Sequence, residues 1–184
     1  MTVPLTLVLG GARSGKSAFV EKLVAESGLN KIYIATGEAR DDEMKDRIAM
    51  HRARRGSDWT TVEAPLDLAD AIVAHASAAA IVLVDCLTLW ISNLLMAERD
   101  LDTAFDDLAG RMGDIAGPVV LVSNEVGLGI VPENALARRF RDAQGQLNQR
   151  MAALADEVYF LAAGLPTTLK CATPLSEYDV DYNI

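Results

Sequence analysis

The sequence predicts an α/β protein with a mostly parallel sheet, helices on both faces and an antiparallel hairpin near the C-terminal end. Apolar runs typical of buried strands alternate with segments of helical periodicity along the chain. Strands that are apolar throughout, and that are separated by helices, indicate a parallel sheet covered on both sides. The 184 residues show no internal repeat or linker, so we expect one domain over residues 1–184.

The expected strands are short apolar runs that end in turn or polar residues, as buried strands do. They are Leu5–Leu9, Ile32–Ala35, Thr60–Val62, Ile81–Val84, Val119–Val122 and Val158–Leu161. The last strand is followed by Gly164-Leu165-Pro166 and then by Thr167–Lys170. This order predicts a hairpin that adds an antiparallel edge to the sheet.

Helical periodicity occupies the segments between the strands, where apolar residues recur at spacings of three and four. The expected helices are Lys16–Ser27, Asp41–Arg55, Leu66–Ala76, Thr88–Ala97, Thr103–Ile115 and Asn134–Ala155. The last helix places six residues on one apolar stripe: Leu136, Phe140, Ala143, Leu147, Met151 and Leu154.

Residues 10–17 carry the most informative motif. They read GGARSGKS and match G-x-x-x-x-G-K-[ST], the P-loop, whose backbone N–H groups surround the phosphates of a nucleoside triphosphate. The glycines let the backbone approach anionic oxygens, and the following helix directs the positive end of its dipole at them. Lys16 would reach the β- and γ-phosphates, and the Ser17 hydroxyl would bind Mg²⁺. The predicted nucleotide-binding residues here are Gly10, Gly11, Ala12, Arg13, Ser14, Gly15, Lys16 and Ser17.

Polar residues and glycine also stand at the carboxyl ends of other predicted strands, where ligands bind in an open parallel sheet. They are Thr36, Gly37, Glu63, Asp85, Ser123, Asn124 and Glu125. Any one of them is also an ordinary turn residue. Asp85 is the stronger candidate because an acid at the end of a buried strand commonly holds Mg²⁺ together with the P-loop hydroxyl. We therefore expect Ser17 and Asp85 to bind Mg²⁺.

The expected helix Asp41–Arg55 has an acidic first turn and a basic last turn that carries Arg52, Arg54 and Arg55. This arrangement complements the helix dipole, so a structural role alone could account for the basic end. His51 lies on the same face as Ile48 and Met44, which is the position of a packed residue as well as of a catalytic one. Neutral imidazole is also a nucleophile near pH 7, and neighbouring guanidinium groups stabilise charge on a phosphorus under attack.

Composition excludes several classes of function. The net charge of −9 argues against nucleic acid as the main partner, and no apolar run is long enough to span a membrane. Cys86 and Cys171 are too few for a disulfide framework, so we expect reduced cysteines and a cytoplasmic protein without a signal peptide. His75 lies in an alanine-rich helix, and we expect a structural role for it.

Three segments together resemble the family of bifunctional adenosylcobinamide kinase/adenosylcobinamide-phosphate guanylyltransferases. They are GGARSGKS, YIATGEARDDEM with RIAMHRARR, and VSNEVGLGIVPENALARRFRDAQGQLNQRMA, and the similarity extends from Leu5 to about Lys170. The resemblance implies a RecA-like P-loop fold and a homotrimer. It implies that ATP or GTP phosphorylates the hydroxyl of adenosylcobinamide. GTP then transfers GMP to that phosphate, which releases pyrophosphate and gives adenosylcobinamide-GDP.

The resemblance also implies roles for individual residues. The family passes GMP through a histidine, and the matching position is His51, so Lys16 and His51 are the expected catalytic residues. Some members have two adjacent histidines, whereas Met50 precedes His51 in this chain. Besides the P-loop, the nucleotide contacts carried over are Ala35, Thr36, Gly37, Arg52, Ala53, Arg54, Arg55, Glu63 and Asp85. We expect Glu63 to accept hydrogen bonds from the guanine base.

Three other functions stay open at this point, of which the main one is a small-molecule P-loop kinase with an inert His51. A GTPase switch is disfavoured because Asp85–Thr88 is not D-x-x-G and Ser123–Val126 lacks the usual guanine-specifying Lys and Asp. A RecA-type ATPase is disfavoured by the net charge of −9. Three apolar loop residues, Leu128, Ile130 and Val131, fit a corrinoid contact, a core or a subunit contact.

Overall fold

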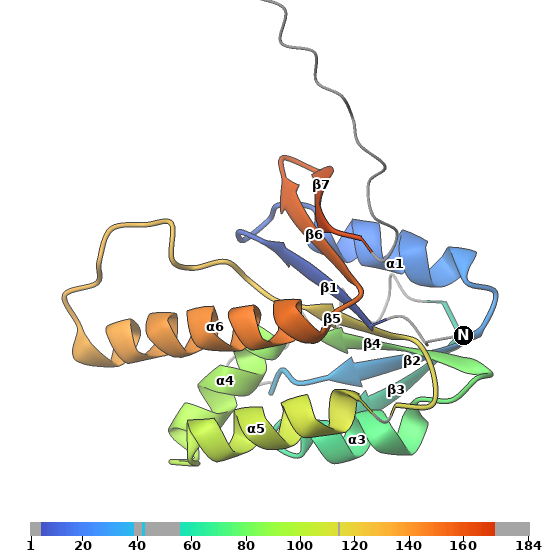
Figure 1. Ribbon diagram of the computed structural model, residues 1–184, viewed down its shortest axis with the longest axis horizontal. Coiled ribbons are helices and arrows are strands. Elements are labelled where there is room, and N and C mark those ends of the chain that lie inside the picture. The colour runs from blue at the N-terminus through green and yellow to red at the C-terminus, as the bar shows by residue number, and fades with distance from the viewer. Residues whose placement is uncertain (1–4, 39–41, 43–55, 114, 172–184) are drawn as a thin grey trace, which may run out of the picture.

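The computed structural model describes residues 5–38, 42, 56–113 and 115–171 (Figure 1). Within these ranges seven strands form one sheet in the order β3-β2-β4-β5-β1-β6-β7. The strands are β1 Leu5–Gly10, β2 Asn30–Ala35, β3 Trp59–Glu63, β4 Ala80–Asp85, β5 Val119–Val122, β6 Glu157–Ala162 and β7 Leu165–Lys170. Every adjacent pair is parallel except β6 and β7, which confirms the mostly parallel sheet and the C-terminal hairpin.

The helices also follow the expected order. They are α1 Lys16–Glu26, α3 Leu68–His75, α4 Leu87–Met96, α5 Leu101–Met112 and α6 Ala135–Leu154. The helix expected over Asp41–Arg55 lies outside the described residues except for Asp42. No helix in the part of the chain that the structure describes is both long enough and apolar enough to cross a membrane.

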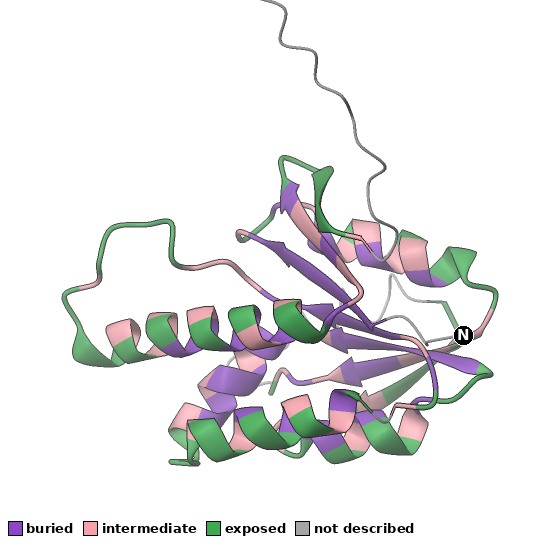
Figure 2. Cartoon of the chain, viewed as in Figure 1, coloured by how far each residue is buried: buried purple, intermediate pink, exposed green. Residues whose placement is uncertain are grey.

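Helices cover both faces of the sheet, but unequally within the described residues (Figures 1 and 2). Val20 and Val24 of α1 pack on one face against the strand residues Val8, Leu83 and Val122. The other face is covered by α3, α4, α5 and α6, whose apolar side chains form the larger cluster. Successive strand residues point to opposite faces, so each central strand supplies both clusters and is apolar at nearly every position; Thr6 of β1 and Asp85 of β4 are exceptions.

The hairpin differs from expectation at its turn. Ala163 and Gly164 form the turn with φ of 53° and 82°, whereas Leu165 and Pro166 already belong to β7. Positive φ at both turn residues matches the twist of a tight hairpin. Pro166 is tolerated because β7 is the edge strand, where a missing N–H breaks no ladder.

The apolar stripe on α6 is only partly buried, and the leucines at its two ends are exposed. Ala143, Leu147 and Met151 are buried, but Leu136 is 61% exposed and Leu154 is 45% exposed. A helix of 20 residues is about 30 Å long, which exceeds the length of the short strand β5 beneath it. The helix ends therefore extend past the sheet, as Figure 1 shows for the N-terminal end of α6.

Two leucines of this stripe provide a test of burial. Leu147→Ala is expected to lower the free energy of unfolding by about 2–5 kcal/mol, because the side chain is fully buried. Leu136→Ala is expected to change it by less than about 0.5 kcal/mol. Urea denaturation followed by circular dichroism measures both. Equal losses in the two variants would contradict the burial assigned to α6.

Candidate nucleotide-binding site

The loop between β1 and α1 is shaped by close approaches that only glycine allows. Gly10 has a φ of 151° and Gly15 a φ of 100°. A Cβ on Gly10 would lie 2.5 Å from the carbonyl oxygen of Leu161, and one on Gly15 would lie 2.9 Å from the Cα of Gly164. The P-loop is therefore pressed against the last strand pair of the sheet.

Lys16 is folded back into this loop. Its Nζ donates hydrogen bonds to the carbonyl oxygens of Gly10 at 2.9 Å and Gly11 at 2.7 Å. Burial of the ammonium lowers the pKa of Lys16, and the acidic groups of Cys86 and Asp85 oppose that shift. The site thus holds a buried cation close to the loop that is predicted to bind phosphate.

Two neighbouring segments fix the loop through backbone hydrogen bonds. Gly164 N–H donates to the carbonyl of Ser14 at 2.8 Å, and Glu125 N–H donates to the carbonyl of Gly10 at 3.1 Å. The contact with Gly164 was missed by sequence reasoning. The sequence feature that could have indicated this contact is Gly164 in the hairpin turn, because a glycine has no side chain to separate that turn from the P-loop.

The sheet brings the other predicted residues to the same edge. Ala35 lies opposite Asp85 on one side and opposite Glu63 on the other, and Asp85 lies opposite Val122. The carboxyl ends of β2, β3, β4 and β5 therefore place Thr36, Glu63, Asp85 and Ser123 along the edge of the sheet at which the P-loop follows β1. The strand β5 separates the P-loop strand β1 from β4, which ends in Asp85.

Thr36 connects two of these strand ends. It is fully buried, and its Oγ1 donates to the carbonyl of Cys86 at 2.7 Å and accepts from the N–H of Cys86 at 2.9 Å. Asn93 of α4 donates to the carbonyl of Thr36 at 2.7 Å and to that of Pro65 at 3.0 Å. The segments after β2, β3 and β4 are thereby held together.

A buried polar network supports the end of β5. Ser123 Oγ donates to Asn148 Oδ1 at 2.7 Å, and Gln144 Nε2 donates to Ser123 Oγ at 2.8 Å. Asn148 in turn donates to the carbonyl of Asn124 at 3.1 Å. Sequence reasoning missed Gln144 and Asn148, although their spacing of four on α6 puts two amides on one helix face.

The residues expected to hold Mg²⁺ fit that ion. Ser17 and Asp85 are half-buried and offer oxygen atoms, which Mg²⁺ prefers, and Tyr33 donates to Asp85 Oδ2 at 3.0 Å. No group of three or more His, Cys, Asp or Glu residues that could hold a metal occurs in the described ranges. Mg²⁺ is commonly bound through one or two protein oxygens, nucleotide phosphates and water. This donor set fits an ion that binds together with a nucleotide.

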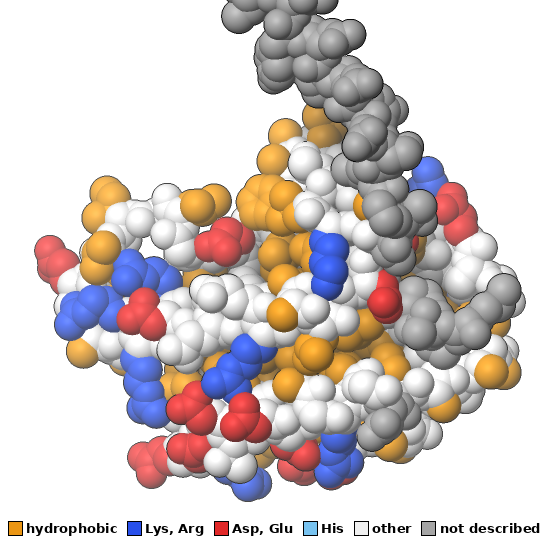
Figure 3. Space-filling model, in the orientation of Figure 1, with side chains coloured by type: hydrophobic (Ala, Val, Ile, Leu, Met, Phe, Trp, Pro, Cys, Tyr) orange, Lys and Arg blue, Asp and Glu red, His pale blue; other side chains and the backbone are white. Residues whose placement is uncertain are grey.

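Two further sets of residues were expected to take part in the site. His51, Arg52, Ala53, Arg54 and Arg55 lie outside the described residues. Leu128, Ile130 and Val131 are 83%, 97% and 60% exposed, so they are not core residues of this chain. Apolar side chains show at the surface of the projecting segment between β5 and α6 (Figure 3). A corrinoid contact or a subunit contact remains the prediction for them.

The two cysteines are free thiols with different environments. Burial, helped by the nearby Asp85 carboxylate, raises the pKa of Cys86 to about 12. We expect iodoacetamide at about pH 8 to modify the half-buried Cys171 and to leave Cys86 unmodified, because only the thiolate reacts. Peptide mass spectrometry measures both sites, and unfolding in urea is the control that exposes Cys86. Rapid labelling of Cys86 in the folded protein would contradict its assigned burial.

Comparison with known proteins agrees with the geometry. The chain matches the family described as cobinamide kinase / cobinamide phosphate guanyltransferase over residues 6–169. It is 51% identical over 166 residues to the bifunctional adenosylcobalamin biosynthesis protein CobP of Pseudomonas aeruginosa, which covers 89% of this chain and 96% of the relative. It is 40% identical over 181 residues to the bifunctional adenosylcobalamin biosynthesis protein CobU of Salmonella typhimurium, which covers 90% and 99%.

A solved structure from Pyrococcus horikoshii OT3 superposes with a TM-score of 0.56 at 11% identity over 93% of this chain and 88% of that one. At this identity the likeness concerns the fold alone. The fold, the P-loop geometry and the similarity along almost the whole chain agree with one another. The chain therefore belongs to the cobinamide kinase / cobinamide phosphate guanyltransferase family of enzymes and has an α/β, RecA-like P-loop fold.

Proposed function

We propose that this protein is a bifunctional enzyme of adenosylcobalamin biosynthesis. It phosphorylates adenosylcobinamide with ATP or GTP and then transfers GMP from GTP to the new phosphate. One observation carries the proposal: the P-loop with its buried lysine lies in a chain that matches bifunctional relatives over about nine-tenths of its length. A plain small-molecule kinase has less support, because these relatives are named bifunctional.

In the kinase step the P-loop grips the β- and γ-phosphates. The Lys16 ammonium, which donates to the carbonyls of Gly10 and Gly11 in the structure, would donate to phosphate oxygens when the nucleotide binds. The substrate hydroxyl attacks the γ-phosphorus, loses its proton, and a nucleoside diphosphate leaves. Mg²⁺, held by Ser17, Asp85 and the phosphates, would neutralise charge on the phosphate oxygens.

In the guanylyl step the P-loop again binds the β- and γ-phosphates of GTP, and these leave together as pyrophosphate. The neutral imidazole of His51 attacks the α-phosphorus of GTP, and the bond to the β-phosphate oxygen breaks. A phosphate oxygen of adenosylcobinamide phosphate then attacks the phosphorus on His51, and the nitrogen–phosphorus bond breaks. The product is adenosylcobinamide-GDP, and His51 is restored.

The remaining expected residues support these steps. Arg52, Arg54 and Arg55 would stabilise charge on the phosphorus under attack. Glu63, at the end of β3, would accept hydrogen bonds from the N–H donors of guanine. A cytoplasmic homotrimer is part of the same proposal, and sedimentation equilibrium measures the number of subunits.

The direct test of the function is the product. Purified protein with adenosylcobinamide, Mg²⁺ and GTP is expected to give adenosylcobinamide-GDP, detected by mass analysis of the corrinoid. Detection of the monophosphate alone would reduce the protein to a kinase, and detection of neither product would contradict the proposal.

The chain contains two histidines, so one is a matched control for the other. With GTP labelled at the α-phosphorus, we expect acid-labile and alkali-stable label on wild-type protein and on His75→Ala, whose ring lies against the carbonyl of Ala71 on α3. His51→Ala is expected to take up no label and to keep the kinase activity, because the nucleophile alone is lost. Label that persists in His51→Ala would show that another residue carries GMP.

A further inference from the structure

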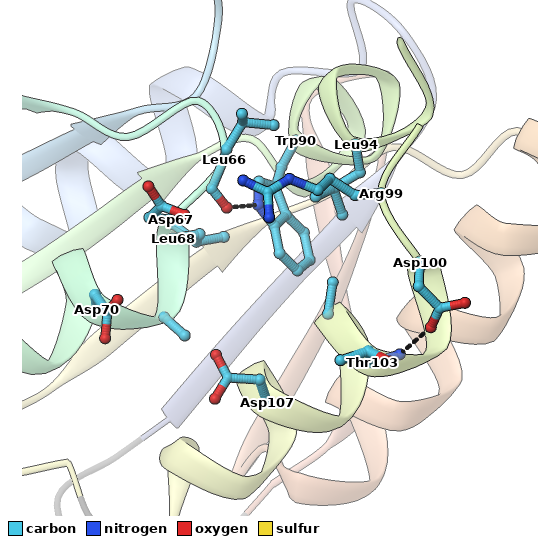
Figure 4. Close-up of a pocket in the computed structure, with 12 residues that line it drawn as sticks. Leu66, Asp67, Leu68, Asp70, Trp90, Leu94, Arg99, Asp100, Thr103 and Asp107 are labelled. Carbon is cyan, nitrogen blue, oxygen red and sulfur yellow. Dashed lines mark hydrogen bonds between the residues drawn. The ribbon is translucent and has the colours of Figure 1, made fainter. Parts of the chain in front are cut away.

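A cavity of about 410 Å³ lies between the first turn of α3, the second half of α4 and the first turns of α5 (Figure 4). This volume is typical of small-molecule sites. One wall is the segment Leu66-Asp67 that follows β3, so the cavity opens near the carboxyl edge of the sheet. It is lined by none of the residues expected to bind nucleotide.

The helix α4 runs from the strand end at Asp85 to the cavity. Cys86, which Thr36 holds by two hydrogen bonds, directly precedes α4, and Leu94 near the other end of α4 lines the cavity. Asn93 bridges the two places, since it donates to the carbonyls of Thr36 and Pro65. A ligand in the cavity therefore lies beside the segment expected to contact the nucleotide.

The floor of the cavity is apolar. Leu68 is fully buried, Trp90 is 2% exposed and Leu94 is 3% exposed. The indole N–H of Trp90 already donates to the carbonyl of Leu66 at 2.7 Å. These buried side chains close the cavity from below, and the partly buried Leu66 and Ala104 present accessible carbon surface that fits methyl or methylene groups.

Among the charged residues of the rim, two have no hydrogen bond or ion pair from their side chains within the described part of the chain: Asp67 and Arg99. The other carboxylates are engaged. Asp70 and Asp107 pair with Arg111 at 2.6 and 3.0 Å, and Asp100 accepts the N–H of Thr103 at 2.8 Å. Figure 4 shows Asp67 and Arg99 coming from two different walls, the segment after β3 and the loop between α4 and α5.

The rim offers an acceptor, Asp67, and a donor, Arg99, and these two groups indicate which functional group of a ligand would bind there. A carboxylate would pair with Arg99 but be repelled by Asp67 and the other acidic residues, and an ammonium would pair with Asp67 but leave the Arg99 guanidinium without an acceptor. A primary carboxamide complements both, because it carries N–H donors and a carbonyl acceptor. Its methylene chain would lie on the apolar floor.

We propose that this cavity is a subsite for a peripheral primary carboxamide arm of the cobinamide substrate. Asp67 accepts the amide N–H, Arg99 donates to the amide carbonyl, and the methylene chain packs on Leu66 and Ala104. Cobinamide carries several such arms on its corrin ring. The inference rests on the proposed function, because it places one part of the substrate whose hydroxyl reaches the P-loop.

Equilibrium dialysis of adenosylcobinamide against the full-length protein tests the subsite. Arg99→Ala and Asp67→Ala are each expected to raise the Kd for adenosylcobinamide about tenfold, and Asp67→Asn, which keeps an uncharged acceptor, to raise it less, while the Kd for GTP stays unchanged. Asn retains a side chain suited to a helix N-cap, so Asp67→Asn leaves α3 intact. The control is Lys22→Ala with Glu26→Gln on α1, which removes one exposed cation and one exposed carboxylate from another surface.

A second experiment measures the selectivity of binding, which would not change if Asp67 had a purely structural role. The probes are the separated monocarboxylic acid derivatives of adenosylcobinamide, each with one amide hydrolysed. We expect wild type to discriminate against at least one of them by about tenfold, and Asp67→Asn to lose that discrimination because the repelling charge is gone.

The outcomes separate the two proposals. If wild type binds adenosylcobinamide and both alanine variants bind it equally well, the subsite is overturned and the proposed function stands. A change in sedimentation with unchanged corrinoid binding would reassign the cavity to a contact between copies of the chain and also overturn it. If wild type binds GTP but no adenosylcobinamide, the proposed function itself fails and the subsite with it.

Discussion

The buried ammonium of Lys16 is the interaction on which the rest of the site depends. A charge removed from water is costly unless it is hydrogen-bonded, and here the carbonyls of Gly10 and Gly11 supply two of its partners. A loop shape that moved either carbonyl away would leave the ammonium unpaired. The P-loop therefore keeps its curvature through its own lysine, and phosphate oxygens can replace the carbonyls without a large rearrangement of the backbone.

The C-terminal hairpin limits where the loop can go. Gly164 donates to Ser14 from one side, and the Cα of Gly164 lies where a side chain on Gly15 would be. The segment after β5 acts from the other side through the N–H of Glu125. The β6–β7 hairpin, which was expected to add an antiparallel edge to the sheet, thus also holds the P-loop in place. A substitution in the hairpin turn can therefore affect the loop without contacting a nucleotide.

The strands were predictable because a short run that is apolar throughout is typical of a strand buried on both faces. The edge that gathers Thr36, Glu63 and Asp85 followed from the parallel sheet. Tertiary detail was not predictable from local pattern. The exposure of Leu136 depends on how far α6 extends past β5. The pairing of Gln144 with Ser123 joins residues 21 apart, and the cavity rim joins Asp67 to Arg99. Periodicity records which face of an element is apolar, and it does not record which elements meet.

The placement of α4 connects the end of β4 with the wall of the cavity. Its first turn follows Asp85, and its Asn93 joins the segments after β2 and β3. Its buried residues Leu87, Trp90 and Ile91 fix it in the larger core, so it cannot shift alone. Because rigid elements hold functional groups more accurately than loops do, a helix anchored in this way sets a fixed spacing between the strand end at Asp85 and the cavity wall at Leu94. That spacing suits the proposed substrate, which would be held by one amide arm while another arm reacts.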